Sequence, residues 1–186
     1  MAKTLILAKT APTDADSGVL RFVHGEDAVV LDDTYPVYEF HFYNLHPSVD
    51  AAKVMFQSSL DTGSNYNIST TTAFLQTYHS EGDGNETFSI NATYSAGNST
   101  SDLYLSDGVG YDNDQSASGV MTLYDPSDTD FVKNFTCEIQ QSSAGDTCNI
   151  SRVAGYINTT SAVDAIRFKF NSGNIDLGTI KMFGVS

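Results

Sequence analysis

The sequence has 186 residues, of which 40% are hydrophobic and 17% are charged, and its formal net charge is −14. Eleven Phe and ten Tyr supply enough large apolar side chains for a packed core, so the composition excludes a disordered chain. An acidic surface repels phosphate backbones and anionic membranes, which argues against nucleic-acid and membrane binding. The acidity fits solubility or a saline environment or, alternatively, a role in binding cations.

The start of the chain does not have the pattern of a secretory signal. Its apolar run, Leu5–Ala8, is closed at once by Lys9 and is much shorter than the apolar core of a signal peptide. No later stretch approaches the length of a transmembrane helix. We therefore expect a protein that is made and folded in the cytoplasm.

Short apolar runs separated by Gly, Asn, Asp and Ser clusters predict an all-β fold. No window of twelve residues keeps the helical spacing of apolar positions, although one helical turn is possible at Ser48–Ala52. Many short strands with turn signals between them favour a β-sandwich or barrel built as a single domain of residues 1–186. The predicted strands are Leu5–Ala8, Gly18–Val23, Val37–Tyr43, Lys53–Ser58, Ala73–Tyr78, Thr87–Ala92, Gly119–Tyr124, Phe131–Cys137, Arg152–Ile157, Val163–Phe170 and Gly178–Phe183.

Strict alternation in two of these runs predicts which side chains form the core. Tyr38, Phe40 and Phe42 share one face of their strand, and Ile166, Phe168 and Phe170 share one face of theirs. With Val54 and Phe56, we expect these faces to meet across two packed sheets. The Asn-Ser-Gly-Asn connection at 171–174 then predicts that the last two strands form a closing antiparallel hairpin.

The middle of the chain, roughly residues 80–118, is rich in Gly, Asp, Asn and Ser, and we expect the longest loops there. Four tyrosines lie in or near turn-rich stretches. They either stack on sugars or cover the edge of a sheet, and the second interpretation is the simpler one. These tyrosines are Tyr66, Tyr94, Tyr104 and Tyr111.

One acidic loop is a candidate calcium site. Asp107, Asp112 and Asp114 are hard oxygen donors on a loop that contains glycine. Their spacing does not match an EF-hand, and no Glu stands at the closing position, so a solvated acidic turn is the alternative. We expect no other cofactor.

Cys137 and Cys148 flank a segment that has the composition of a hairpin loop. The two thiols could therefore face each other across the ends of two strands. They would stay free in a reducing cytoplasm, and a disulfide could form later outside the cell. Both states remain open at this point.

No sequence motif predicts catalysis, and we expect a protein that is not an enzyme. The Gly-x-Ser-x-Gly elbow, the phosphate loop and the dinucleotide fingerprint are all missing from the sequence. The histidines His24, His41, His46 and His79 do not have the spacing of metal ligands.

Four sequence blocks resemble a group of virion structural proteins of marine tailed bacteriophages. They are Thr34–Pro47 (TYPVYEFHFYNLHP), Leu60–Tyr66 (LDTGSNY), Gly155–Ile166 (GYINTTSAVDAI) and Phe170–Gly184 (FNSGNIDLGTIKMFG). The resemblance implies an antiparallel two-sheet sandwich, jelly-roll-like, that assembles as a homo-oligomer, with a trimer expected by analogy. It implies no catalytic residues.

Within that group, the expected role is a capsid-surface decoration or cement protein that stabilises the head. Its partner would be the major capsid protein or another virion protein, through positive groups that face this chain's carboxylates. The alternative is a receptor-binding domain of a tail or head fibre, with a host surface glycan as its ligand. Either role places the mature protein in the virion.

Overall fold

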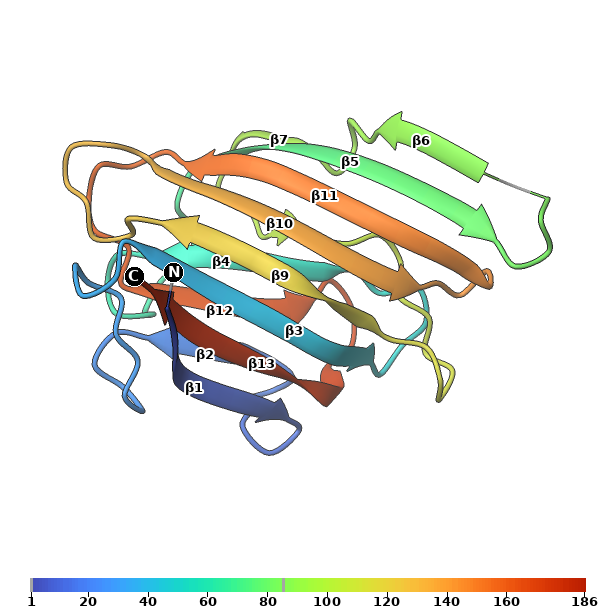
Figure 1. Cartoon of the computed structure of the whole chain (residues 1–186), viewed down its shortest axis with the longest axis horizontal. Coiled ribbons are helices and arrows are strands. Elements are labelled where there is room, and N and C mark those ends of the chain that lie inside the picture. Colours follow the sequence, from blue (N-terminus) through green and yellow to red (C-terminus); the bar gives the residue numbers. More distant parts are fainter. Residues whose placement is uncertain (1, 85) are drawn as a thin grey trace.

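Thirteen antiparallel strands form two sheets that pack face to face (Figure 1). The structure is a computed structural model that describes residues 2–84 and 86–186, in which 55% of the chain is strand and no helix occurs. The strands are β1 (Lys3–Ala11), β2 (Leu20–Val23), β3 (Val37–Pro47), β4 (Val54–Ser59), β5 (Thr70–Ser80), β6 (Glu86–Ile90), β7 (Ala96–Ser99), β8 (Leu103–Tyr104), β9 (Ala117–Tyr124), β10 (Lys133–Ser142), β11 (Thr147–Ile157), β12 (Ala165–Phe170) and β13 (Ile175–Val185).

The two sheets are unequal in size. The larger has nine strands in the order β1-β13-β3-β9-β10-β11-β5-β6, with β7 also paired to β5, and the smaller has the order β2-β12-β4-β8. The chain crosses between the sheets at every connection from β1 to β5 and again from β7 to β9 and from β11 to β13. The two packed antiparallel sheets confirm the predicted all-β sandwich.

The predicted core faces meet between the sheets. Phe168 of β12 packs against Phe40 and Phe42 of β3, with ring centroids 5.2 Å apart in both pairs. Phe22 of β2 completes this cluster at 5.3 Å from Phe40. All four rings are at most 2% exposed, so the period-2 alternation correctly identified the buried face of each strand.

The predicted closing hairpin is wrong. β12 pairs with β2 and β4 in the smaller sheet, whereas β13 pairs with β1 and β3 in the larger one. The connection at 171–174 is a corner between sheets, where Asn174 exchanges hydrogen bonds of 2.8 and 3.0 Å with Ser48. Gly173 has a φ of +67° at this corner, which a residue with a Cβ rarely adopts.

The polar middle of the chain also differs from the prediction. Two further short strands, β7 and β8, form there, and the longest connection without a strand is 24–36, not one within 80–118. Residues 48–52 form a turn and a bridge, with no helical turn. Polar composition alone does not separate short paired strands from loops, because β7 and β8 contain mostly Gly, Asn, Ser and Tyr.

Candidate ligand groove and exposed apolar face

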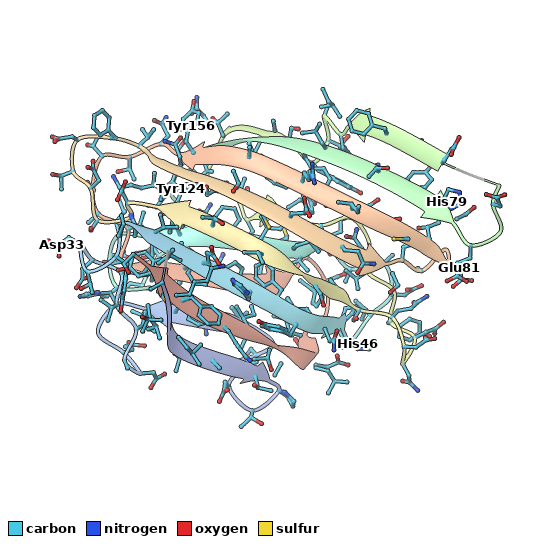
Figure 2. The ribbon with its side chains drawn as sticks, viewed as in Figure 1. Asp33, His46, His79, Glu81, Tyr124 and Tyr156 are labelled. Atoms are coloured by element: carbon cyan, nitrogen blue, oxygen red, sulfur yellow. The ribbon has the colours of Figure 1, made fainter. Side chains whose placement is uncertain are left out.

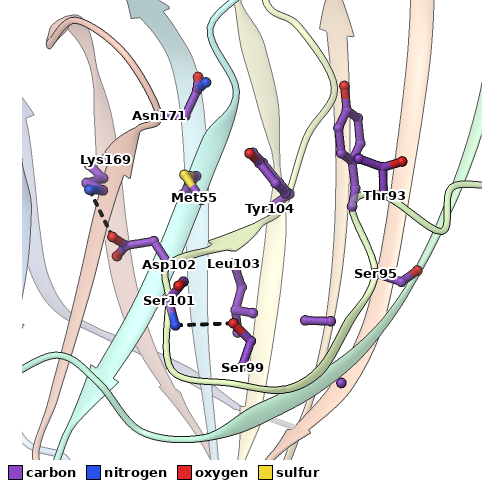
Figure 3. Close-up of a pocket in the computed structure, with 13 residues that line it drawn as sticks. Met55, Thr93, Ser95, Ser99, Ser101, Asp102, Leu103, Tyr104, Lys169 and Asn171 are labelled. Atoms are coloured by element: carbon purple, nitrogen blue, oxygen red, sulfur yellow. Dashed lines mark hydrogen bonds and ion pairs between the residues drawn. The ribbon is translucent and has the colours of Figure 1, made fainter.

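A groove of about 580 Å³ lies on the outer side of the smaller sheet (Figure 3). Its base is formed by β4 and β12, and its wall by the segment 93–104, which contains β7 and β8. The residues that give it its chemical character are Met55, Tyr94, Asp102, Tyr104, Lys169 and Asn171.

The wall of the groove is held by hydrogen bonds local to residues 91–95. The Asn91 side-chain carbonyl accepts bonds from the backbone N–H groups of Thr93 and Tyr94, at 3.0 and 3.1 Å. The hydroxyl of Ser95 donates to the backbone carbonyl of Asn91 and accepts from the N–H of Phe74 on β5. Asn commonly forms such a turn with its own following backbone, and here the turn places Tyr94 against the sandwich.

An ion cluster lies at one side of the groove. Arg167 donates to both carboxylate oxygens of Asp102, with its Nε at 3.0 Å and its Nη2 at 2.8 and 3.0 Å. The Lys169 ammonium is 2.9 Å from the same carboxylate. A dashed line marks this ion pair in Figure 3. Arg167 also covers the ring of Tyr66, at 4.6 Å from its centroid. The single carboxylate of Asp102 therefore forms ion pairs with two cations.

Two tyrosines form the aromatic part of the groove. The rings of Tyr94 and Tyr104 lie 4.8 Å apart at an angle of 43°, and Lys53 lies 5.6 Å from the Tyr94 centroid. Burial raises the pKa of Tyr94 to about 12, with a further contribution from the charge of Asp107 and from a hydrogen bond to its carboxylate. The Tyr94 hydroxyl is thus a neutral group at physiological pH. Aromatic rings beside a few polar groups are typical of sites for small polar ligands.

Only part of this groove could be found from sequence. Tyr94 and Tyr104 are candidates because they lie near turns. Lys169 stands between Phe168 and Phe170 in the sequence, so the alternation that buries these two rings puts Lys169 on the opposite, wet face of the strand. Asp102 and Asn171 carried no signal, because their partners come from distant parts of the chain; Asp102 and Arg167 are 65 positions apart. Of the other two tyrosines, Tyr66 packs beneath Arg167 and Tyr111 lies elsewhere, beside His46.

A second surface feature is the outer side of the larger sheet, where apolar residues gather. Phe88 and Ile90 of β6 are 78% and 72% exposed. Their cross-strand neighbours on β5 are Thr77 and Leu75, and Thr77 in turn pairs with Ile150 of β11. We call this surface the apolar face; its members are Leu75, Phe88, Ile90, Val120, Ile150 and Ala154.

The apolar face carries few charges. Its central pair is Arg152 and Glu138, which neutralise each other. Shallow hollows of about 370 and 410 Å³ lie on either side of Arg152. His79 of β5 and Tyr156 of β11 lie at the two ends of this side of the sheet (Figure 2). The chain thus keeps one broad surface nearly neutral despite its net charge of −14.

The structure does not bring the calcium candidates together. Asp107 accepts a 2.8 Å bond from the N–H of Gly108 beneath Tyr94, whereas Asp112 and Asp114 are exposed in the next turn. Among residues 2–84 and 86–186, no group of three or more His, Cys, Asp or Glu side chains could hold a metal ion. Short sequence spacing failed here because Val109 pairs with Ala52 between the two sites, and Asp112 and Asp114 belong to the separate turn that follows.

The cysteines are both free, and the fold keeps them apart. Cys137 lies opposite Val153 on β10 and faces the core, whereas Cys148 lies opposite Ser142 and is exposed. Five positions along β10 separate the two pairs, or roughly 16 Å of strand, and a disulfide needs Cα atoms less than about 7 Å apart. The predicted β-hairpin forms, but its register excludes the disulfide alternative.

The four histidines have structural partners. The Nδ1 of His24 accepts from the N–H of Leu31, His41 contacts Glu39, and His79 lies 3.2 Å from Asp83. His46, at one end of the sandwich in Figure 2, joins β13 to the turn at 111–112. His24 and His46 join separate segments of the chain, whereas the contacts of His41 and His79 are local to one strand and one turn.

In the part of the chain that the structure describes, no helix is long and apolar enough to cross a membrane. Comparisons with protein-family models, with curated proteins and with solved structures found no match for this chain.

Proposed function

We propose that this protein is a non-enzymatic structural protein of a bacteriophage virion, and that it decorates and stabilises the capsid surface. The observation that carries the proposal is the apolar face. Soluble proteins rarely leave large side chains such as Phe88 and Ile90 side by side in water, unless another molecule covers them. The resemblance of the four sequence blocks to virion proteins supports a capsid protein as that molecule.

The edge of the sheet supports the same role. β6 is the last strand of the larger sheet, and among residues 2–84 and 86–186 it pairs with β5 alone, so its other side is an exposed edge of backbone N–H and C=O groups. An exposed edge is a template on which a strand of another protein can pair. Phe88 and Ile90 lie on this strand, and they would add apolar contacts to such pairing.

The proposed assembly includes further copies of this chain. We infer a homo-oligomer, by analogy a trimer, that joins neighbouring major capsid proteins and strengthens the head against internal pressure. The chain is made in the host cytoplasm and resides in the virion. Multi-angle light scattering of the purified protein measures the oligomeric state, and a monomer at all concentrations would contradict the trimer.

Labelling the protein on intact virions tests the role. We expect hundreds of copies on the head, and particles that lack the protein should lose capsid integrity while adsorption to cells is unchanged. The variant Phe88→Ser with Ile90→Ser should fail to rebind such particles. Phe131→Ser is the matched control, because Phe131 is equally exposed, at 73%, but lies in the connection before β10. A few copies at the tail, with lost adsorption, would contradict the proposal.

A second candidate function is glycan binding by a receptor-binding domain of a tail or head fibre. The specific observation in its favour is the groove with Tyr94, Tyr104 and the Asp102 ion cluster. Its experiment is direct: oligosaccharides should bind the isolated protein, and Tyr104→Ala should abolish that binding without lowering the thermal stability by more than a few degrees.

A further inference from the structure

Positive charge gathers beside the groove, on the outer side of the smaller sheet, although the chain as a whole is strongly acidic. Four of the nine Lys and Arg residues belong to the outer side of the smaller sheet: Arg21, Lys53, Arg167 and Lys169. Arg21 and Arg167 are directly opposite each other on β2 and β12. Like charges in cross-strand pairs lower the stability of a sheet. An anionic ligand bound beside these cations would reduce their mutual repulsion.

The cations outnumber the carboxylates that neutralise them. Asp16 pairs with Arg21 at 2.7 Å, but Asp102 serves both Arg167 and Lys169. The Nε and Nη2 groups of Arg167 already donate to the Asp102 carboxylate, and the Arg167 side chain is 23% exposed. Lys169 is 30% exposed, and among the described residues its ammonium has no other ion-pair partner than Asp102. Two of its three N–H groups are thus free to donate into the groove.

The surroundings of Lys169 suit a sugar ring. Tyr94 and Tyr104 supply aromatic surface on which the C–H groups of a sugar pack, and Met55 forms apolar floor beneath. Asn171 stands at the other end of the groove from Asp102 (Figure 3). A nucleic acid would need a run of several cations along its backbone, and one free ammonium does not provide it.

We propose that this groove binds an acidic saccharide, with Lys169 pairing with a carboxylate or sulfate on a sugar that stacks against Tyr104. The inference rests on glycan binding, the second candidate function, and adds the class of glycan. A charge-assisted bond at Lys169 gives the discrimination against neutral sugars, because a neutral ligand leaves the surplus positive charge uncompensated.

Isothermal titration with three hexasaccharides tests the proposal: a uronate hexamer prepared from alginate, a sulfated galactan hexamer, and neutral cellohexaose. We expect at least one acidic hexamer to bind about tenfold more tightly than cellohexaose or better. Lys169→Gln should remove that preference, whereas Lys181→Gln, on the larger sheet, should keep it. Comparing the uronate with the sulfated hexamer identifies which anion the groove prefers, and either preference supports the proposal.

Salt dependence of the unmodified protein provides a readout that does not rely on a folded variant. Affinity for the acidic hexamer should fall steeply as NaCl rises, and affinity for cellohexaose should not. Equal affinity for acidic and neutral hexamers, unchanged by Lys169→Gln, would overturn the acidic class and leave glycan binding intact. If no hexamer shifts the amide resonances of Tyr104 and Lys169, both this inference and glycan binding fail.

Discussion

Arg167 and Asp102 form a bidentate pair that ties β12 to the wall of the groove, with the shortest bond at 2.8 Å. Both side chains are mostly buried, at 23% and 14% exposed, so water screens the pair only partly. The pair therefore has two effects: it fixes segment 93–104 on the smaller sheet, and it holds the cations of the groove in place.

Asp102→Asn should destabilise the protein by about 2 kcal/mol, because it leaves Arg167 and Lys169 facing each other without a countercharge. Urea unfolding followed by circular dichroism measures the change. The control is Glu138→Gln, which breaks the exposed pair with Arg152 and should cost less than about 0.5 kcal/mol. Equal losses in the two variants would mean that Asp102 makes no special contribution.

Phe168→Ala should be much more damaging, with a loss of about 3–5 kcal/mol. The Phe168 ring is fully buried and contacts Phe22, Phe40 and Phe42, so its removal leaves a cavity between the two sheets. Phe131→Ala removes the same ring from a site that is 73% exposed and should change the free energy of unfolding by less than about 0.5 kcal/mol. A small loss at Phe168 would show that the sheets do not pack through this cluster.

The aromatic cluster also shows which features of the fold can be predicted from the sequence. Alternation in Val37–Tyr43 and Val163–Phe170 tells which side chains are buried, because a strand with one wet face has a period of 2. Alternation does not tell which strands are neighbours, and β12 and β13 have the same pattern although they belong to opposite sheets. Sheet membership depends on the corner at 171–174, whose contacts with Ser48 lie far away in sequence.

The groove illustrates the same limit at the level of the site. Tyr94 and Tyr104 could be suspected because turns expose aromatic residues, and Lys169 could be placed on a wet face. These three residues lie close to Asp102 because β8 pairs with β4. β8 is too short and polar to be recognised in a sequence. Asp107, Asp112 and Asp114 are the opposite case, since their closeness in sequence did not bring them together in space.

Thiol titration should find one reactive cysteine in the folded protein and two after unfolding. Cys148 is exposed, whereas Cys137 is buried in the core. Burial strongly raises the pKa of the Cys137 thiol, which keeps it in the unreactive protonated form. Cys148→Ser should abolish the signal of the folded protein. An intramolecular disulfide after mild oxidation, seen by mass spectrometry, would contradict the register of β10 and β11.

His46 should make stability depend on pH. Its Nδ1 lies 2.7 Å from a carboxylate oxygen of Asp176, and its Nε2 lies 3.0 Å from the carbonyl of Tyr111 and 3.3 Å from that of Asp112. Both ring nitrogens face acceptors, so only the imidazolium can donate to both sides. Burial disfavours this charged form, but the hydrogen bond and the charge of Asp176, with the two carbonyls, raise the pKa of His46 above its ordinary value of 6.5.

A pKa that is higher in the folded state than in the unfolded state adds stability at low pH. The contribution of His46 is fully present below about pH 6.5, and it is lost as the pH rises through the raised pKa of the folded state. His46→Gln should therefore destabilise the protein more at pH 5.5 than at pH 8.5, as measured by urea unfolding at each pH. Asp176→Asn should reduce the pH dependence in the same way, and combining the two substitutions should add little, because each breaks the same contact.

His79→Gln is the control, since the His79 contact with Asp83 is exposed and should contribute little to stability at either pH. A destabilisation by His46→Gln that is equal at both pH values would show that the ring is neutral in the folded protein and that the turn at 111–112 is held by other contacts.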